Sequence, residues 1–129
     1  MAGGNMPDPY VAPPLSCANV NAERDRRLAA GFADAVTGKT WQCDALSQGK
    51  WTAIGASAGL AMVMQIDPPP TFELIAADNS IVTLSALEAF TLTNGRIMPW
   101  VSATMLYARA MKNLIAAETP PADIAAGWP

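Results

Sequence analysis

The sequence predicts an α+β domain in which three helices pack on a small antiparallel sheet built from two hairpins, behind an extended Pro-rich N-terminal arm. Three observations support this prediction. Apolar residues recur at helical spacing over three segments, short alternating segments flank turn residues, and prolines gather near both ends of the chain. Helices that cover a small sheet are the economical way to bury such apolar faces.

The composition favours one folded domain. The chain has 129 residues, of which 51% are hydrophobic and 15% charged, and its net charge is -3. This composition supplies a core, and the acidic balance argues against nucleic-acid binding. The first ten residues lack a basic, apolar leader, and the most apolar stretch, 51–66, is too short to span a bilayer. We therefore expect neither a signal peptide nor a membrane span.

The prolines suggest where the domain begins and ends. We expect residues 1–18 to form an extended arm, residues 19–117 the α+β domain, and residues 118–129 a C-terminal tail. Proline removes a backbone donor and favours extended geometry. The prolines of the arm are Pro7, Pro9, Pro13 and Pro14. Apolar residues stand among them, so two interpretations stay open: a free tail, or an arm that adheres to its own or a neighbouring surface.

The first predicted elements are a short helix and a hairpin. The helix runs from Val20 to Ala30, with Asn19 or Asn21 as its N-cap and Gly31 as its left-handed C-terminal residue. The hairpin turns at residues 36–39, and its second strand alternates apolar with polar residues through residue 43.

A second helix is predicted from its N-cap Asp44 to about Gln65, where three consecutive prolines follow shortly. Gly55 and Gly59 lie one turn apart and give the helix a thin side that another backbone can approach closely. A stripe at helical spacing is expected to pack. The stripe comprises Leu46, Ala53, Ser57, Leu60 and Met64.

A second hairpin and a third helix complete the domain. The hairpin strands cover residues 72–77 and 80–84, and Ser85 and Glu88 match a capping box that opens the third helix. Asn94-Gly95 and Pro99 predict a break or kink within that helix. Its expected apolar face comprises Ile97, Val101, Met105, Ala108, Met111 and Ile115.

The groups that drive most enzymatic reactions are missing from the sequence. The chain has no histidine, which removes the commonest general base, the usual catalytic triads and most metal sites. The letters Gly38-Lys39-Thr40 fail as a phosphate-binding loop because Ala33 replaces the required glycine. We expect no catalytic residue, no cofactor and no metal. The two cysteines, Cys17 and Cys43, are either free thiols or one disulfide.

Apolar residues remain after the predicted core is filled. Leu106 points away from the core face of the last helix, so either a partner chain covers this side or the arm or tail does. Both interpretations stay open. The candidate assembly interface comprises Tyr10, Leu15, Trp100, Leu106, Tyr107, Leu114 and Trp128.

An ordered set of short motifs resembles a known family. The motifs are residues 24–28 with 31–32, residues 41–44, residues 54–56, residues 77–80 with 82–84, and residues 108–112. In order, they resemble an uncharacterised domain-of-unknown-function family of tailed phages and prophages, whose domain often ends tail-fibre or other tail proteins. The resemblance covers residues 22–116. Members tend to run the last helix through, which Asn94-Gly95 and Pro99 interrupt here.

The resemblance implies a non-catalytic structural component of a tailed-bacteriophage virion, made in the host bacterial cytoplasm. It would be tail-associated, as a fibre, tip or adaptor piece, and would assemble with itself and with other virion tail proteins. Two alternatives stay open. One is a tail-fibre assembly chaperone, and the other is a carboxylate-dependent glycan hydrolase, for which Asp44, Asp67, Asp78 and Glu88 are the residues to test.

Overall fold

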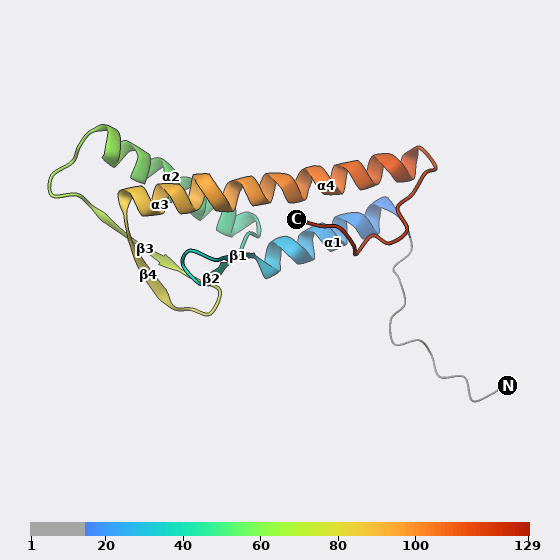
Figure 1. Cartoon of the computed structure of the whole chain (residues 1–129), viewed down its shortest axis with the longest axis horizontal. Coiled ribbons are helices and arrows are strands. Elements are labelled where there is room, and N and C mark those ends of the chain that lie inside the picture. Colours follow the sequence, from blue (N-terminus) through green and yellow to red (C-terminus); the bar gives the residue numbers. More distant parts are fainter. Residues whose placement is uncertain (1–14) are drawn as a thin grey trace, which may run out of the picture.

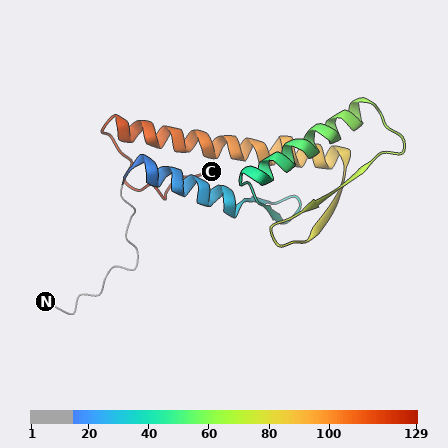
Figure 2. The ribbon, with the colours of Figure 1, turned by 180° about the vertical axis from the view of Figure 1, so that it is seen from behind.

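The computed structural model describes residues 15–129, and helices make up most of this part of the chain (Figure 1). In chain order the elements are α1 (Cys17–Ala30), β1 (Phe32–Asp34), β2 (Lys39–Trp41), α2 (Ala45–Val63), β3 (Thr71–Ile75), β4 (Ile81–Ser85), α3 (Ala86–Leu92), the π-helical turn η1 (Thr93–Ile97) and α4 (Met98–Ala116). The segments α3, η1 and α4 continue into one long rod (Figures 1 and 2). Along this rod, α1 packs on α4, and α2 packs on α3 and η1. The predicted α+β class with three helices is confirmed.

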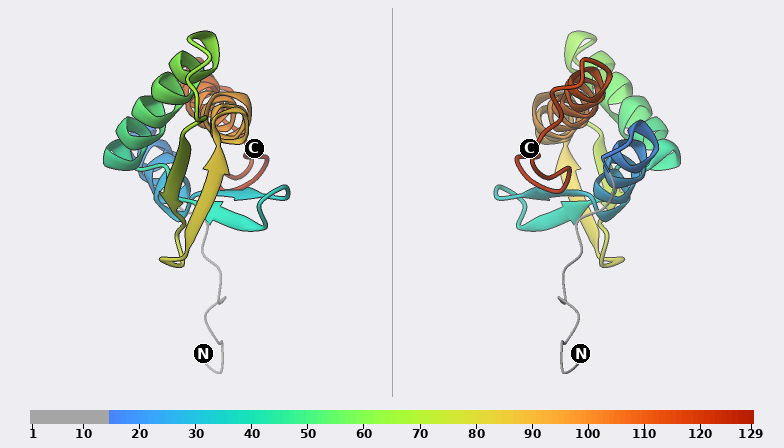
Figure 3. Two further views of the ribbon diagram at one scale, coloured as in Figure 1. Left: turned by 90° about the vertical axis from the view of Figure 1, so that its left-hand side faces the viewer. Right: turned by 90° about the vertical axis from the view of Figure 1, so that its right-hand side faces the viewer.

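The two hairpins form two separate two-stranded antiparallel sheets, β1-β2 and β3-β4. Seen along the rod, they run in different directions beneath the helices (Figure 3). One backbone hydrogen bond joins them, from the Ala77 N–H to the Thr40 carbonyl at 2.9 Å. Within the second hairpin the register pairs Thr71 with Ser85 and Ile75 with Ile81. The sheets therefore meet at a corner.

Several short-range predictions are confirmed. Asp44 is the N-cap of α2. The capping box is present, because the Ser85 Oγ accepts the Glu88 N–H at 3.1 Å and the Glu88 Oε1 accepts the Ser85 N–H at 3.0 Å. Asn79 has φ 66°, as the turn of the second hairpin requires. These features depend on neighbours within a few residues, which the sequence shows directly.

The predicted start of α1 is wrong by three residues. Ser16 is the N-cap, because its side chain accepts the N–H of Asn19, so neither asparagine has this role. The helix begins at Cys17, and residues 17 and 18 belong to it rather than to the arm. Gly31 ends it with φ 101° and donates its N–H to the Arg27 carbonyl, as expected from a C-terminal glycine.

The core consists of two apolar clusters. The larger one lies between α2, α3 and the hairpins, and its centre is Trp41, which is fully buried and meets Trp51 edge to face with ring centroids 5.5 Å apart. Both indole N–H groups are satisfied: Trp41 donates to the Thr37 Oγ1, and Trp51 donates to the Gln42 carbonyl. The smaller cluster joins α1, α4 and the C-terminal segment. Its buried members are Val20, Ala108, Met111 and Ile124.

The prediction of close approach at Gly55 and Gly59 is confirmed. A Cβ at Gly55 would lie 2.7 Å from the Thr93 Oγ1, and one at Gly59 would lie 3.1 Å from the Phe90 ring. The glycines therefore face α3 and η1, and their missing side chains let the helices pack closely.

The sequence predicted a break or a kink in the last helix at Asn94-Gly95 and Pro99. The regular α-helix is interrupted at this place, although the helix is not broken. At Asn94-Gly95 the chain forms the π turn η1, in which the Met98 N–H bonds the Thr93 carbonyl five residues back. Pro99, in the first turn of α4, is thus accommodated and the helix continues. One residue of the predicted apolar face is wrong: Met105 is 44% exposed, and Thr104 is buried in its place, its hydroxyl bonded to the Trp100 carbonyl. Among residues 15–129, none of the helices combines the length and apolar character that a bilayer span requires.

Candidate interaction surface

The structure scatters the six described residues of the predicted seven-residue assembly interface. Tyr10 lies outside the described residues. Leu15, Leu106 and Leu114 are exposed, the first ahead of α1 and the other two on α4. The remaining three, Trp100, Tyr107 and Trp128, are half-buried. Trp100 packs on Phe32 of β1, with ring centroids 5.8 Å apart. Tyr107 and Trp128 contact each other, with ring centroids 4.9 Å apart.

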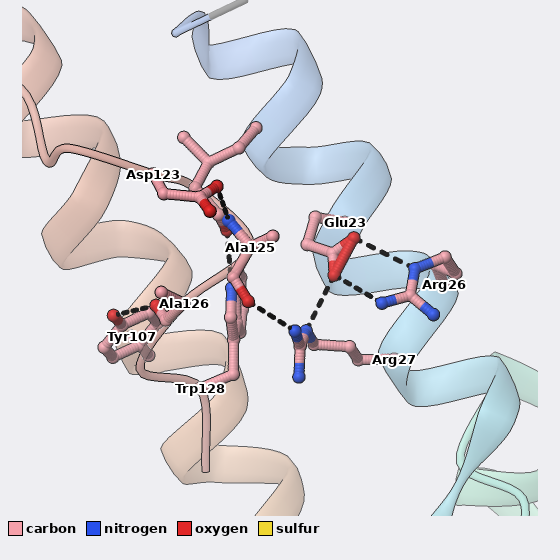
Figure 4. Close-up of polar contacts among 9 residues, drawn as sticks. Glu23, Arg26, Arg27, Tyr107, Asp123, Ala125, Ala126 and Trp128 are labelled. Atoms are coloured by element: carbon pink, nitrogen blue, oxygen red, sulfur yellow. Dashed lines mark hydrogen bonds and ion pairs between the residues drawn. The ribbon is translucent and has the colours of Figure 1, made fainter. Parts of the chain in front are cut away.

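The C-terminal segment folds back over α1 and α4 (Figure 4). Its contacts are specific: the Tyr107 hydroxyl donates to the Ala126 carbonyl at 2.7 Å, and the Trp128 Nε1 donates to the Ile124 carbonyl at 2.7 Å. Ile124 itself is buried in the smaller cluster. The sequence left open whether a partner chain or the chain's own arm or tail covers the last helix. The structure shows that the tail covers the side of α4 that carries Tyr107.

Arg27 of α1 holds this segment in place. Its Nε bonds the Glu23 Oε2 at 2.8 Å, its Nη2 bonds the Ala125 carbonyl at 2.8 Å, and its guanidinium lies 5.3 Å from the centre of the Trp128 ring. Arg26 also bonds Glu23, and this bond, more than the one from Arg27, lowers the pKa of the Glu23 carboxyl against the opposing effect of burial. A fixed charge on Glu23 orients Arg27 toward the C-terminal segment (Figure 4).

Replacing Trp128 with alanine is expected to lower the free energy of unfolding by about 2 kcal/mol, because the ring contact with Tyr107 and the cation–π contact with Arg27 are both lost. Leu106→Ala is the control, since Leu106 is 66% exposed and its truncation is expected to change little. Urea denaturation followed by circular dichroism measures both variants. An unchanged midpoint for Trp128→Ala would show that the segment does not contribute to stability.

A second apolar surface runs along the solvent side of α2, and we call it the outer stripe. Its four residues are each more than half exposed, and Val63 reaches 83%. They are Leu46, Leu60, Val63 and Met64. A surface helix normally presents a polar side to water. Among the 19 residues of α2, Lys50 is the only charged one. The helix is therefore apolar on both sides.

The sequence predicted that a stripe of five α2 residues packs, and this prediction is wrong because all five are exposed: Leu46, Ala53, Ser57, Leu60 and Met64. The buried side of α2 carries smaller residues, such as Gly55 and Ala58, so the large side chains gave a misleading pattern. The positions of Gly55 and Gly59 indicate correctly which side of α2 packs against the rest of the domain. Leu46 and Met64 each lie about two and a half turns from Gly55, which places them on the opposite side of the helix. A thin side that packs and a large apolar side opposite to it together predict an exposed stripe.

A groove of about 580 Å³ lies between α2 and β3. The α2 side contributes Trp51, Ala53 and Ile54, and the β3 side contributes the backbone and side chains around Glu73 and Ile75. Lys50 also lines it. A second groove, of about 440 Å³, lies on the other side of the hairpin, beside β4 and α3. Both grooves are open and partly apolar, as expected of places where another chain packs.

Comparison with known proteins places the chain in one family. Residues 12–126 match the family described as Domain of unknown function (DUF4376). The chain belongs to this family. No curated protein and no solved structure matches the chain significantly. The DUF4376 match includes Ile124, so most of the C-terminal segment that covers α4 falls within the family's domain.

Two of the four candidate carboxylates of this DUF4376 domain, those of Asp78 and Glu88, are occupied in local structure. Asp78 bonds the N–H and hydroxyl of Ser80 and the Lys39 ammonium, and these bonds, those from Ser80 first, lower its pKa to about 2. Bonds from the Ser85 backbone and hydroxyl likewise lower the pKa of Glu88. A general acid for glycoside hydrolysis needs a raised pKa, which is the opposite shift. Asp44 lies at the N-cap position of α2, but its side chain makes no capping hydrogen bond. Asp67 is exposed in the loop between α2 and β3.

Asp34 is the one carboxylate that is almost fully buried among residues 15–129. Burial raises its pKa, but bonds from Arg96 and from Thr37 outweigh this effect and leave the pKa lowered. The Arg96 Nε lies 2.7 Å from Oδ1, and the Thr37 N–H and hydroxyl both bond Oδ2. This ion pair ties the turn of the first hairpin to η1.

Both cysteines are free thiols, which decides between the two alternatives left open above. Burial raises the pKa of the Cys43 thiol to about 11, so this sulfur stays protonated and unreactive at neutral pH. Within the described part of the chain, no three acidic or cysteine side chains come together to hold a metal ion. Among residues 15–129 of the DUF4376 domain, the apolar surfaces open to solvent include the outer stripe of α2, the exposed side of α4 and the two grooves.

Proposed function

We propose that this DUF4376 protein is a structural component of a tailed-bacteriophage virion. It is associated with the tail as a fibre, tip or adaptor piece, and it works by assembling with itself and with other tail proteins. The assignment to a phage tail is based on the ordered resemblance of residues 22–116. The assembly role is supported by one observation above all, the outer stripe of α2.

Covering the outer stripe stabilises an assembly. Removing apolar surface from water contributes about 25 cal/mol per Å², or roughly 1.5–3 kcal/mol for one fully covered side chain of this size. The stripe offers four such side chains on one helix, and the single charge of α2, on Lys50, lies one turn after Leu46 on the same side. Depletion of charge at the centre is typical of protein–protein interfaces. A partner helix or sheet laid along residues 60–64, where no charged residue occurs, would therefore bind without burying an unpaired charge.

The exposed side of α4 gives the domain a second apolar contact region. Leu106 and Leu114 lie there, on a different helix from the outer stripe. A subunit within an ordered particle contacts neighbours on more than one side. Two separate apolar regions on one small domain suit this role.

The test is a charge placed within the outer stripe. Val63→Glu is expected to reduce the amount of this protein in purified particles at least tenfold, because an ionised carboxylate in an apolar interface has no partner. Ala22→Glu, at an exposed position of α1 outside both apolar regions, adds the same charge and is expected to leave incorporation unchanged. Quantitative mass spectrometry of washed particles measures incorporation, and thermal unfolding shows that both variants fold.

Each other outcome counts against the proposal. If the unchanged protein is abundant in the lysate and absent from washed particles, the protein acts as an assembly chaperone and not as a virion component. If Val63→Glu is incorporated as well as the unchanged protein, the outer stripe is not the interface. An effect of Ala22→Glu equal to that of Val63→Glu would show that charge alone, and not its position, prevents assembly.

A further inference from the structure

The outer edge of β3 has unpaired backbone groups. The Ala76 N–H bonds the Ser80 carbonyl, so Ala76 faces β4. Backbone groups alternate between the two edges of an antiparallel strand, so Thr71, Glu73 and Ile75 direct their N–H and C=O groups away from β4. No hydrogen bond to these groups is formed within residues 15–129. An open strand edge is a template for pairing with another chain.

The groove of about 580 Å³ lies beside this edge. Trp51 and Ile54 of α2 form its apolar wall, and Glu73 and Ile75 belong both to the lining and to the open edge. The site thus offers backbone pairing along one side and apolar contact along the other. An extended segment satisfies both requirements, as in other cases of strand addition.

We infer that the N-terminal segment of a second copy adds to this edge as an antiparallel strand. A strand that pairs on one side bonds through every second residue. In this segment Asp8, Tyr10 and Ala12 have backbone N–H groups at alternate positions, whereas Pro7, Pro9 and Pro13 occupy the other alternate positions and Pro14 follows the three donors. The three donors match the three open residues of β3.

The prolines then have a positive role. At the alternate positions they lie on the outer side of the added strand, where no N–H is needed. Pro7, Pro9 and Pro13 all lie at these outer positions, and Val11 is the remaining residue on the outer side. Prolines at an outer edge also prevent a further strand from pairing there, which ends the sheet. This pattern is typical of an edge strand.

Side-chain direction supports the same arrangement. In antiparallel pairing, residues opposite each other share a face. Pro9 and Val11 would then lie on the face of Phe72 and Leu74, toward the apolar wall of the groove. Tyr10 would lie on the other face, where the cross-strand pair Ile75–Ile81 is exposed by 60% and 62%.

The segment has to come from another copy because of its reach. Ala12 is five residues from Cys17, which an extended chain covers in about 17 Å. The 14 residues of α1 alone span about 21 Å. The hairpin β3-β4 lies beyond the other end of α1, at the far end of the molecule (Figure 1). The inference specifies the self-assembly within the proposed function.

Proline substitutions at an inner position and at an outer position of the added strand test the pairing. Tyr10→Pro removes the central N–H donor and is expected to weaken self-association at least tenfold. Val11→Pro adds a proline at an outer position, and Tyr10→Ala removes only the ring. The dissociation constants of both variants are therefore expected to stay within threefold of that of the unchanged protein. Sedimentation equilibrium of the purified full chains measures the dissociation constants. Equal weakening by Tyr10→Pro and Val11→Pro would overturn the inference.

Mixing two defective chains provides the second test. Ala53→Arg places a long charged side chain in the groove from an exposed position of α2, and it leaves the N-terminal segment intact. Ala53→Arg and Tyr10→Pro are each expected to remain monomeric alone and to form one-to-one complexes when mixed. If the mixture stays monomeric although each chain is folded, the inference is wrong. In that case the proposed function is still tested separately. Its test is whether the unchanged chain is incorporated into particles and whether Val63→Glu prevents this incorporation.

Discussion

Replacing Gly31 with alanine is expected to destabilise the domain by about 3 kcal/mol, through left-handed strain and overpacking together. Gly31 has φ 101°, a backbone conformation that residues with a Cβ rarely adopt. A Cβ there would also lie 2.5 Å from the Trp41 carbonyl oxygen and 2.9 Å from its carbon. These are backbone atoms of β2, and Trp41 is fully buried, so the contact cannot be relieved by a side-chain rotation.

Gly49→Ala is the matched control for this substitution. Gly49 lies in α2, and a Cβ there would meet no atom within 4 Å. Alanine is expected to stabilise the helix by up to about 1 kcal/mol through its higher helix propensity. Urea denaturation of both variants gives the free energies of unfolding. If Gly31→Ala is as stable as the unchanged protein, the junction between α1 and β1 has more freedom than this geometry allows.

Removing the carboxylate of Asp34 is expected to have an effect of similar size. Asp34→Ala leaves the Arg96 guanidinium three-quarters buried without its partner, and it leaves the Thr37 N–H without an acceptor. Breaking a buried ion pair on one side costs about 3–5 kcal/mol, and the partial exposure of Arg96 places this case near the lower value. Asp25→Ala is the control, because the Asp25 side chain is 66% exposed and its bond to Arg24 lies at the surface.

The contribution of Asp34 depends on pH in a definite direction. Its pKa is lowered in the folded protein by the bonds from Arg96 and Thr37, which outweigh burial. The stabilisation is therefore present above the unfolded-state pKa of about 3.9 and is lost as the pH falls through the folded-state pKa. The stability difference between the unchanged protein and Asp34→Ala is expected to shrink below about pH 4. A difference that stays constant between pH 7 and pH 3 would contradict this assignment.

The parts of the fold that depend on short-range contacts were predictable from the sequence. The capping box at Ser85 and Glu88 and the cap at Asp44 need only neighbours within one turn. The π turn was not predictable in the same way. The expectation that Pro99 interrupts the helix assumes the regular hydrogen bonds of an α-helix. A wider turn satisfies the same backbone without a break.

The candidate surface was less predictable, because burial depends on what lies opposite each helix. Leu60 and Met64 look like core residues until α3 is known to pack on the glycine side of α2. Trp128 looked like a free aromatic residue, yet Tyr107 and Arg27 hold it in the fold. In each case the deciding partner lies far along the chain, and no local pattern identifies it.

The π turn also fixes how the two halves of the molecule are aligned. A π turn contains one residue more than an α turn, so an α-helix of the same length would place every later side chain about 100° away around the axis. Ala108 and Met111 would then leave α1 while Ala89 kept its place beside α2. Deleting one residue from Thr93–Ile97 would instead allow an ordinary α-helix with the same alignment. The wide turn therefore compensates for one extra residue, so that both ends of the rod face their partners at once.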